Sequence, residues 1–189
     1  NEKVENLIGV FSSYTNLATI SYNRGQNDYS EKYLIEACKI GNKISENHEC
    51  DAILRLAYLY RKSGKYDMAK QIISTTDKFY EIVPINRAKL SKIQGNIAVD
   101  KLNKFYYNKT ANYDKIAELE NEALHNYVNA FQIFETVGDV VNLMTLCYDL
   151  GFLYEFSKCL SEPRWNAQDW FRKCLDLSLK LDDIPMIID

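Results

Sequence analysis

The chain has 189 residues, a net charge of −3 and a pI near 5.5, so it lacks the basic surplus that a phosphate backbone requires. Apolar residues make up 47% and charged residues 26%, and the 3 prolines and 7 glycines are too few for a turn-rich all-β fold. No apolar stretch reaches the ~20 residues of a membrane span. Nucleic-acid binding and membrane insertion are therefore not expected, and a cytoplasmic location is predicted.

The periodicity of the apolar residues predicts an all-helical chain. The expected helices cover residues 3–23, 28–45, 50–63, 66–81, 85–107, 114–136, 139–158 and 164–181. Asp28, Asn112 and Asp139 stand at helix starts, where a side-chain oxygen can cap free N–H groups.

A frame of small and large residues recurs along these helices. Its small members are Ala18, Ala57, Gly95 and Gly151 in first helices, and Ser30, Ala69, Ala123 and Ala167 in second helices. Two helices cross closely where both side chains are small, so each small pair predicts the crossing point of a helix hairpin. In the clearest copy, Leu56, Ala57 and Tyr60 precede the turn at Gly64, and Ala69 and Ile73 follow it.

This frame resembles the tetratricopeptide repeat family, in a longer subtype of about forty residues per repeat. The resemblance covers about residues 10–182 and implies a right-handed α-solenoid of about four antiparallel helix hairpins. The repeats would span about 10–45, 50–81, 85–136 and 139–181 within a single domain over 1–189.

The third hairpin contains an insertion, which predicts two elongated helices. Its tip would hold Phe105, Tyr106, Tyr107 and Tyr113. Two interpretations stay open: these aromatic residues form a contact surface, or they hold the two long helices together. A shorter insertion around Ser161–Pro163 in the fourth hairpin predicts a longer loop.

The last residues, 184–188, read like the start of another first helix. Repeat arrays need polar caps at their ends, so this apolar end indicates a fragment of a longer protein.

No catalytic motif or metal-ligand spacing is present in the sequence. The five cysteines are odd in number and lack C-x-x-C spacing, so we expect reduced, buried thiols. His48 is expected in a loop and His125 on a helix surface, while Glu118, Glu120 and Glu122 are expected on a solvated helix face. The chain is therefore predicted to be no enzyme and to need no cofactor or metal.

The resemblance places the ligand groove along the first helices, at positions that packing does not use. The expected partner-binding residues are Asn16, Thr19, Asn23, Arg55, Tyr58, Lys62, Lys89, Lys92, Asn96, Tyr148 and Phe152, with Phe105, Tyr106 and Tyr107 at the hairpin tip. Ser12, Thr15, Asp51, Asp100, Asp149 and Glu155 would lie along the same groove. The cations favour acidic side chains or a C-terminal carboxylate. Lys92 and Asn96 match the carboxylate clamp of some family members, although Asp149 would repel such a ligand.

The predicted function is protein or peptide recognition, as the sensor or scaffold part of a larger regulatory protein. A peptide-pheromone receptor domain is a narrower version of this hypothesis. Two alternatives stay open: an array that self-associates through its ends, and an accessory domain of an NTPase or protease. The partner, the oligomeric state and the pathway cannot be deduced from the sequence.

Overall fold

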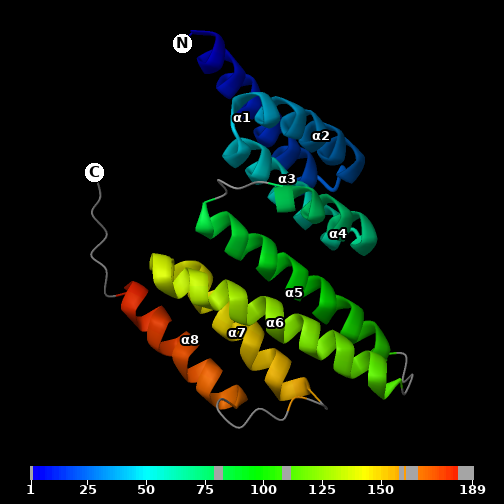
Figure 1. Ribbon diagram of the computed structural model, residues 1–189, viewed down its shortest axis with the longest axis vertical. Coiled ribbons are helices and arrows are strands. Elements are labelled where there is room, and N and C mark those ends of the chain that lie inside the picture. Colours follow the sequence, from blue (N-terminus) through cyan, green and yellow to red (C-terminus); the bar gives the residue numbers. More distant parts are fainter. Residues whose placement is uncertain (1, 79–82, 108–111, 158–159, 161–165, 183–189) are drawn as a thin grey trace. The chain divides into compact units, whose positions relative to one another are not determined.

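The computed structural model describes residues 2–78, 83–107, 112–157, 160 and 166–182, and every element in these ranges is a helix, which confirms the all-α prediction (Figure 1). The α-helices are α1 (Glu2–Asn23), α2 (Asn27–Ile44), α3 (Glu46–Lys62), α4 (Tyr66–Ser74), α5 (Pro84–Tyr107), α6 (Tyr113–Val137), α7 (Val140–Phe156) and α8 (Ala167–Asp182), and a short 3-10 helix covers Thr75–Lys78. The predicted loop around Ser161–Pro163 and the apolar end at 184–188 lie outside the described residues. Within the described ranges, no helix has the length and apolarity needed to cross a bilayer.

The chain divides into two compact units, residues 1–93 and 94–189. Unit 1 holds α1 to α4, unit 2 holds α6 to α8, and α5 contributes its first turns to unit 1 and the rest to unit 2.

In unit 1, each helix packs against the next along the chain (Figure 1). The predicted small residues at the two crossings, Ala18 with Ser30 and Ala57 with Ala69, are all buried. Small side chains at a crossing let the two helix axes approach closely. Larger neighbouring side chains fill the space on either side of the crossing. One close approach of two helix backbones was not predicted. A Cβ added to Gly41 of α2 would lie 2.7 Å from the backbone nitrogen of Glu49 in α3.

In unit 2, the crossings combine a glycine with an aromatic ring. A Cβ on Gly95 of α5 would lie 2.5 Å from the ring of Tyr127 in α6, and one on Gly151 of α7 would lie 2.6 Å from the ring of Phe171 in α8. The two elongated helices expected from the insertion are α5 and α6, of 24 and 25 residues.

Local signals at the helix ends were mostly predicted correctly. Asn112 caps α6 and Asp139 caps α7, each accepting a backbone N–H three residues ahead. Gly64 has a φ of 72°, as its turn requires. The prediction for Asp28 was wrong, because α2 begins one residue before it and Asp28 lies in the first turn, where a carboxylate instead complements the helix dipole.

Candidate partner-binding surfaces

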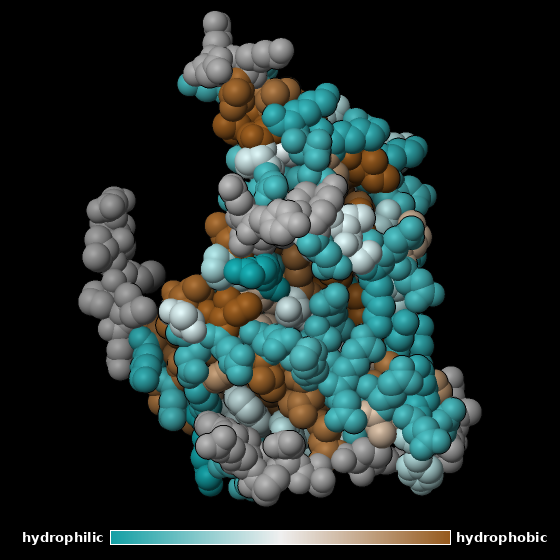
Figure 2. Space-filling view, in the orientation of Figure 1, coloured by the Kyte–Doolittle hydropathy of each residue, from teal (hydrophilic) through white to brown (hydrophobic). Residues whose placement is uncertain are grey.

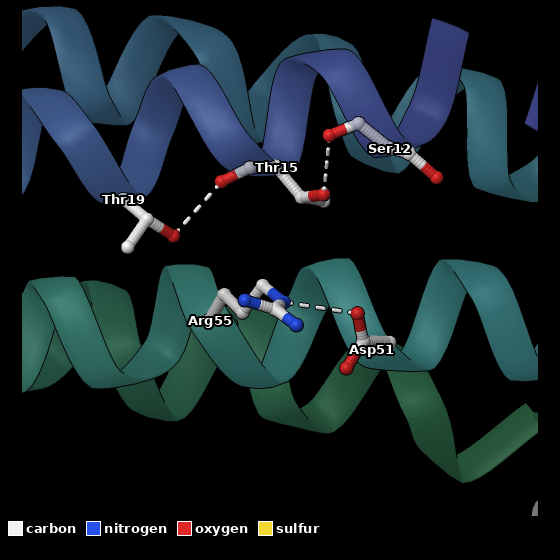
Figure 3. A network of polar contacts seen from close by, with 5 residues as sticks. All are labelled: Ser12, Thr15, Thr19, Asp51 and Arg55. Carbon is white, nitrogen blue, oxygen red and sulfur yellow. Dashed lines mark hydrogen bonds and ion pairs between the residues drawn. The ribbon is translucent and has the colours of Figure 1, made fainter. Parts of the chain in front are cut away.

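In unit 1, α1 and α3 present polar side chains to each other (Figure 3). The hydroxyls of Thr15 and Thr19 donate to main-chain oxygens of α1 at 3.0 and 2.9 Å. Across from them, Nε of Arg55 donates to Asp51 at 2.9 Å, one turn away on α3. This contact occupies one of the five guanidinium N–H donors and leaves the two terminal NH₂ groups to reach another acceptor.

The same face continues toward the C-terminal ends of α1 and α3 with an aromatic pair. The rings of Tyr22 and Tyr58 pack edge to face with centroids 6.1 Å apart, and the ammonium of Lys62 lies 5.6 Å from the Tyr58 ring centroid. Burial raises the pKa of Tyr22, and the neighbouring Tyr58 adds to this rise. Sequence reasoning missed Tyr22, although it follows Thr15 and Thr19 at helical spacing on one face.

The predicted groove residues of unit 1 differ in exposure. Asn16, Thr19, Asn23, Arg55, Tyr58 and Lys62 are exposed, whereas Thr15 is buried. We refer to Thr19, Tyr22, Arg55, Tyr58 and Lys62 as the α1–α3 face. It combines two cations, two aromatic rings and a hydroxyl within two neighbouring helices.

The residues predicted on α5 are more enclosed. Lys89, Lys92 and Asn96 are half-buried. The side-chain oxygen of Asn96 accepts the hydroxyl of Tyr127 at 2.8 Å, so this amide takes part in the α5–α6 hairpin. This hydrogen bond uses one of the two lone pairs of the amide oxygen that a peptide N–H could have reached.

In unit 2, α7 exposes a row of aromatic rings. Tyr148 and Phe152 were predicted on this face, and Phe156 extends it one turn further. The Phe152 ring stacks on Phe156 at 5.8 Å and meets Phe171 of α8 edge to face at 5.6 Å. Apolar atoms are visible over the C-terminal turns of α7 (Figure 2). Phe156 follows Phe152 at the helical spacing i, i+4, and this signal was available from the sequence.

The α5 end of the elongated hairpin carries one exposed and two half-buried aromatic residues near its tip. Tyr107 is exposed, while Phe105 and Tyr106 are half-buried. The Tyr106 hydroxyl donates to Glu120 of α6, which supports the interpretation that this ring holds the long helices together.

Glu120 corrects a prediction made from the sequence. It was expected on a solvated helix face beside Glu118 and Glu122, yet its exposed fraction is 0%. It lies on the same helix face as the buried Ile116 and Ala123, which its spacing from them could have indicated. Besides Tyr106, the hydroxyl of Ser157 donates to the Glu120 carboxyl at 2.8 Å.

The thiols and imidazoles of the described residues have structural surroundings. Burial raises the pKa of Cys38 and Cys147 to about 12 and that of Cys50 to about 11, which disfavours the reactive thiolate. His48 lies in the first turn of α3, not in a loop, because Ser45 caps that helix and its hydroxyl contacts the imidazole at 2.8 Å. His125 is exposed on α6, as predicted.

Among the described residues, no group of three or more His, Cys, Asp or Glu side chains is placed to hold a metal ion. Comparisons with protein-family models and with curated proteins find no match for this sequence.

Proposed function

We propose that this chain is a tetratricopeptide-like recognition module that binds a protein or peptide and catalyses no reaction. Stacking of its hairpins into a right-handed α-solenoid, a cytoplasmic location and a sensor or scaffold role in a larger protein are parts of this proposal. The α1–α3 face is the observation that carries it.

Three features of the α1–α3 face support peptide binding. Arg55 is held by Asp51, so its guanidinium is oriented before a ligand arrives, which reduces the entropy lost on binding. Tyr58 exposes a ring large enough to anchor a side chain, and Lys62 lies close beside it. Thr19 and the tyrosine hydroxyls can exchange hydrogen bonds with a peptide main chain.

The charge of the α1–α3 face favours a particular kind of ligand. Arg55 and Lys62 are exposed and lie two turns apart on α3, with Tyr58 between them. An extended segment with a carboxylate near an apolar or aromatic side chain would satisfy both the cations and the ring. We therefore propose acidic peptide segments, including C-terminal carboxylates, as the ligand class.

A peptide library tests this proposal. Peptides with free or amidated C-termini and with acidic, neutral or basic sequences would be screened by fluorescence anisotropy against the parent chain. The double variant Arg55→Glu, Lys62→Glu should lose at least about tenfold in affinity, because a desolvated charge pair contributes roughly 1.5–3 kcal/mol.

The matched control is Lys32→Glu, Lys39→Glu, which makes the same change in net charge on exposed residues of α2. Its affinity should stay within about twofold of the parent. Equal losses in both variants would show that only net charge matters, and the absence of binding by any library member would contradict the proposal.

A further inference from the structure

α1 exposes apolar residues at positions that are buried in α3 and α7. Leu17 and Ile20 are 42% and 47% exposed. The repeat frame aligns them with Leu56 and Leu59 of α3, which are 2% and 3% exposed. The corresponding residues of α7, Leu150 and Leu153, are also buried.

The second helix of the preceding hairpin, α2, packs against α3. Cys38 of α2 packs against a cluster that contains Ala52 of α3, and Nδ2 of Asn42 donates to Glu49 at 2.6 Å. Gly41 brings the two backbones together at this point. A first helix in this register is therefore shaped to receive a second helix of the same repeat on the face that α1 leaves exposed.

α8 carries the matching surface at its own outer face. Leu175 and Leu179 are 58% and 54% exposed. The repeat frame aligns them with Cys38 and Asn42, the α2 residues that contact α3. They follow Phe171 one and two turns later on α8.

The aromatic row of α7 broadens this surface. The Phe171 ring lies 6.0 Å from Tyr148 and 5.6 Å from Phe152. Tyr148 and Phe152 align with Thr15 and Thr19, which face the following first helix within unit 1 (Figure 3). Both helices of the last hairpin thus present large apolar side chains at the positions where a following hairpin packs.

The charges at these two surfaces are complementary. In the contact between α2 and α3, the C-terminal end of α2 lies at the N-terminal end of α3, as the Asn42–Glu49 hydrogen bond shows. The same arrangement would bring the exposed Lys180 in the last turn of α8 toward the exposed Glu5 in the first turns of α1. A pair of opposite charges at one end of the contact favours this orientation over the reverse one.

We propose that a second copy of this chain covers these surfaces, with α8 of one molecule docked on α1 of the next as α2 docks on α3. The two surfaces differ, so the contact is heterologous and each pair of molecules keeps one free α1 surface and one free α8 surface. This inference does not depend on ligand binding at the α1–α3 face, because Leu17 and Ile20 do not belong to that face.

Analytical ultracentrifugation of the full chain at about 5–500 µM tests the contact. This concentration range suits the weak affinity expected of an interface smaller than standard size. As the concentration increases, the average mass should rise from the 22.0 kDa of one chain to about twice that value or more. The variants Leu17→Glu, Ile20→Glu and Leu175→Glu, Leu179→Glu should each remain monomeric. Circular dichroism would verify that both are folded, as expected for substitutions of half-exposed residues.

Mixing the two variants in equal amounts gives the decisive readout. The first variant keeps its α8 surface and the second keeps its α1 surface, so together they should form dimers and nothing larger. Met68→Glu, at an equally exposed apolar residue of α4, should associate like the parent. A parent that stays monomeric, a mixture that stays monomeric, or either variant associating alone would overturn the proposal.

Discussion

Each unit contains a glutamate on a second helix that accepts a tyrosine hydroxyl from a first helix, but the two glutamates differ in burial. In unit 1, Glu31 accepts Tyr60 at 3.1 Å and Lys65 at 2.7 Å and remains partly exposed. In unit 2, Glu120 accepts Tyr106 and Ser157 and is fully buried. The same bond therefore supports a surface contact in one unit and an internal polar network in the other, where loss of a partner costs more.

The largest expected effect comes from removing the buried carboxyl. Glu120→Ala should lower the free energy of unfolding by about 3 kcal/mol, because it leaves a cavity and takes their acceptor from two half-buried hydroxyls. Glu118→Ala on the exposed side of α6 should change it by less than about 0.5 kcal/mol. Urea denaturation measures both, and equal effects would contradict the buried placement of Glu120.

The glycine crossings of unit 2 give the next largest effect. Gly151→Ala should destabilise by about 2 kcal/mol, because the new methyl group would displace the Phe171 ring. Gly9 lies within α1 with open space around its Cβ position, so Gly9→Ala should stabilise by about 0.5–1 kcal/mol through helix propensity. Thermal unfolding would compare the stability of the two variants. A stabilised Gly151→Ala variant would show that α7 and α8 leave room for a methyl group at their crossing.

Tyr106 and Tyr60 allow the effect of burial to be measured, because a Tyr→Phe substitution removes a single hydroxyl oxygen in each unit. Tyr106→Phe should cost about 1.5 kcal/mol, since its acceptor Glu120 has no exposed surface through which to bind water. Tyr60→Phe should cost about 0.5 kcal/mol, since Glu31 can recruit water and keeps its contact with Lys65. Chemical denaturation of both variants tests the ranking, and the reverse order would refute the comparison.

The smallest effect near neutral pH is titration of the buried thiols. Cys38 in unit 1 and Cys147 in unit 2 have a pKa of about 12 in the folded chain against 9.0 for a free thiol, so the unfolded chain loses these protons first as the pH rises. Stability should be unaffected below about pH 8 and should fall from about pH 9 to 12.

Urea denaturation at increasing pH measures this fall, with circular dichroism reporting on the whole chain and tryptophan fluorescence on unit 2, which contains both tryptophans. Each unit contains a thiol whose pKa is raised to about 12, so both signals should weaken as the pH rises. Loss of one signal at a clearly lower pH than the other would show that the two units unfold independently.

The sequence predicted the helices and their crossing points because both depend on short-range patterns. Ala57 and Ala69 are buried as expected, and Asp139 caps α7. Glu120 and Tyr22 were missed although their helical spacing places them on these faces, because the identity of a side chain indicates its usual environment and not its partner on another helix. Asn96 shows the same limit, because its acceptor is used by Tyr127, 31 residues away in the chain.

The sequence by itself determined that the chain is helical and where its hairpins cross, because periodicity and small residues act within a few turns of one helix. Tertiary structure decided which polar groups are buried and which apolar faces are left exposed. Leu17 and Leu56 occupy the same place in the repeat, yet among the described helices Leu56 is buried in α3, against which α2 packs, and Leu17 is exposed on α1. Burial depends on the neighbours that a helix has in space, and the same sequence pattern therefore yields a core residue in α3 and a surface residue in α1.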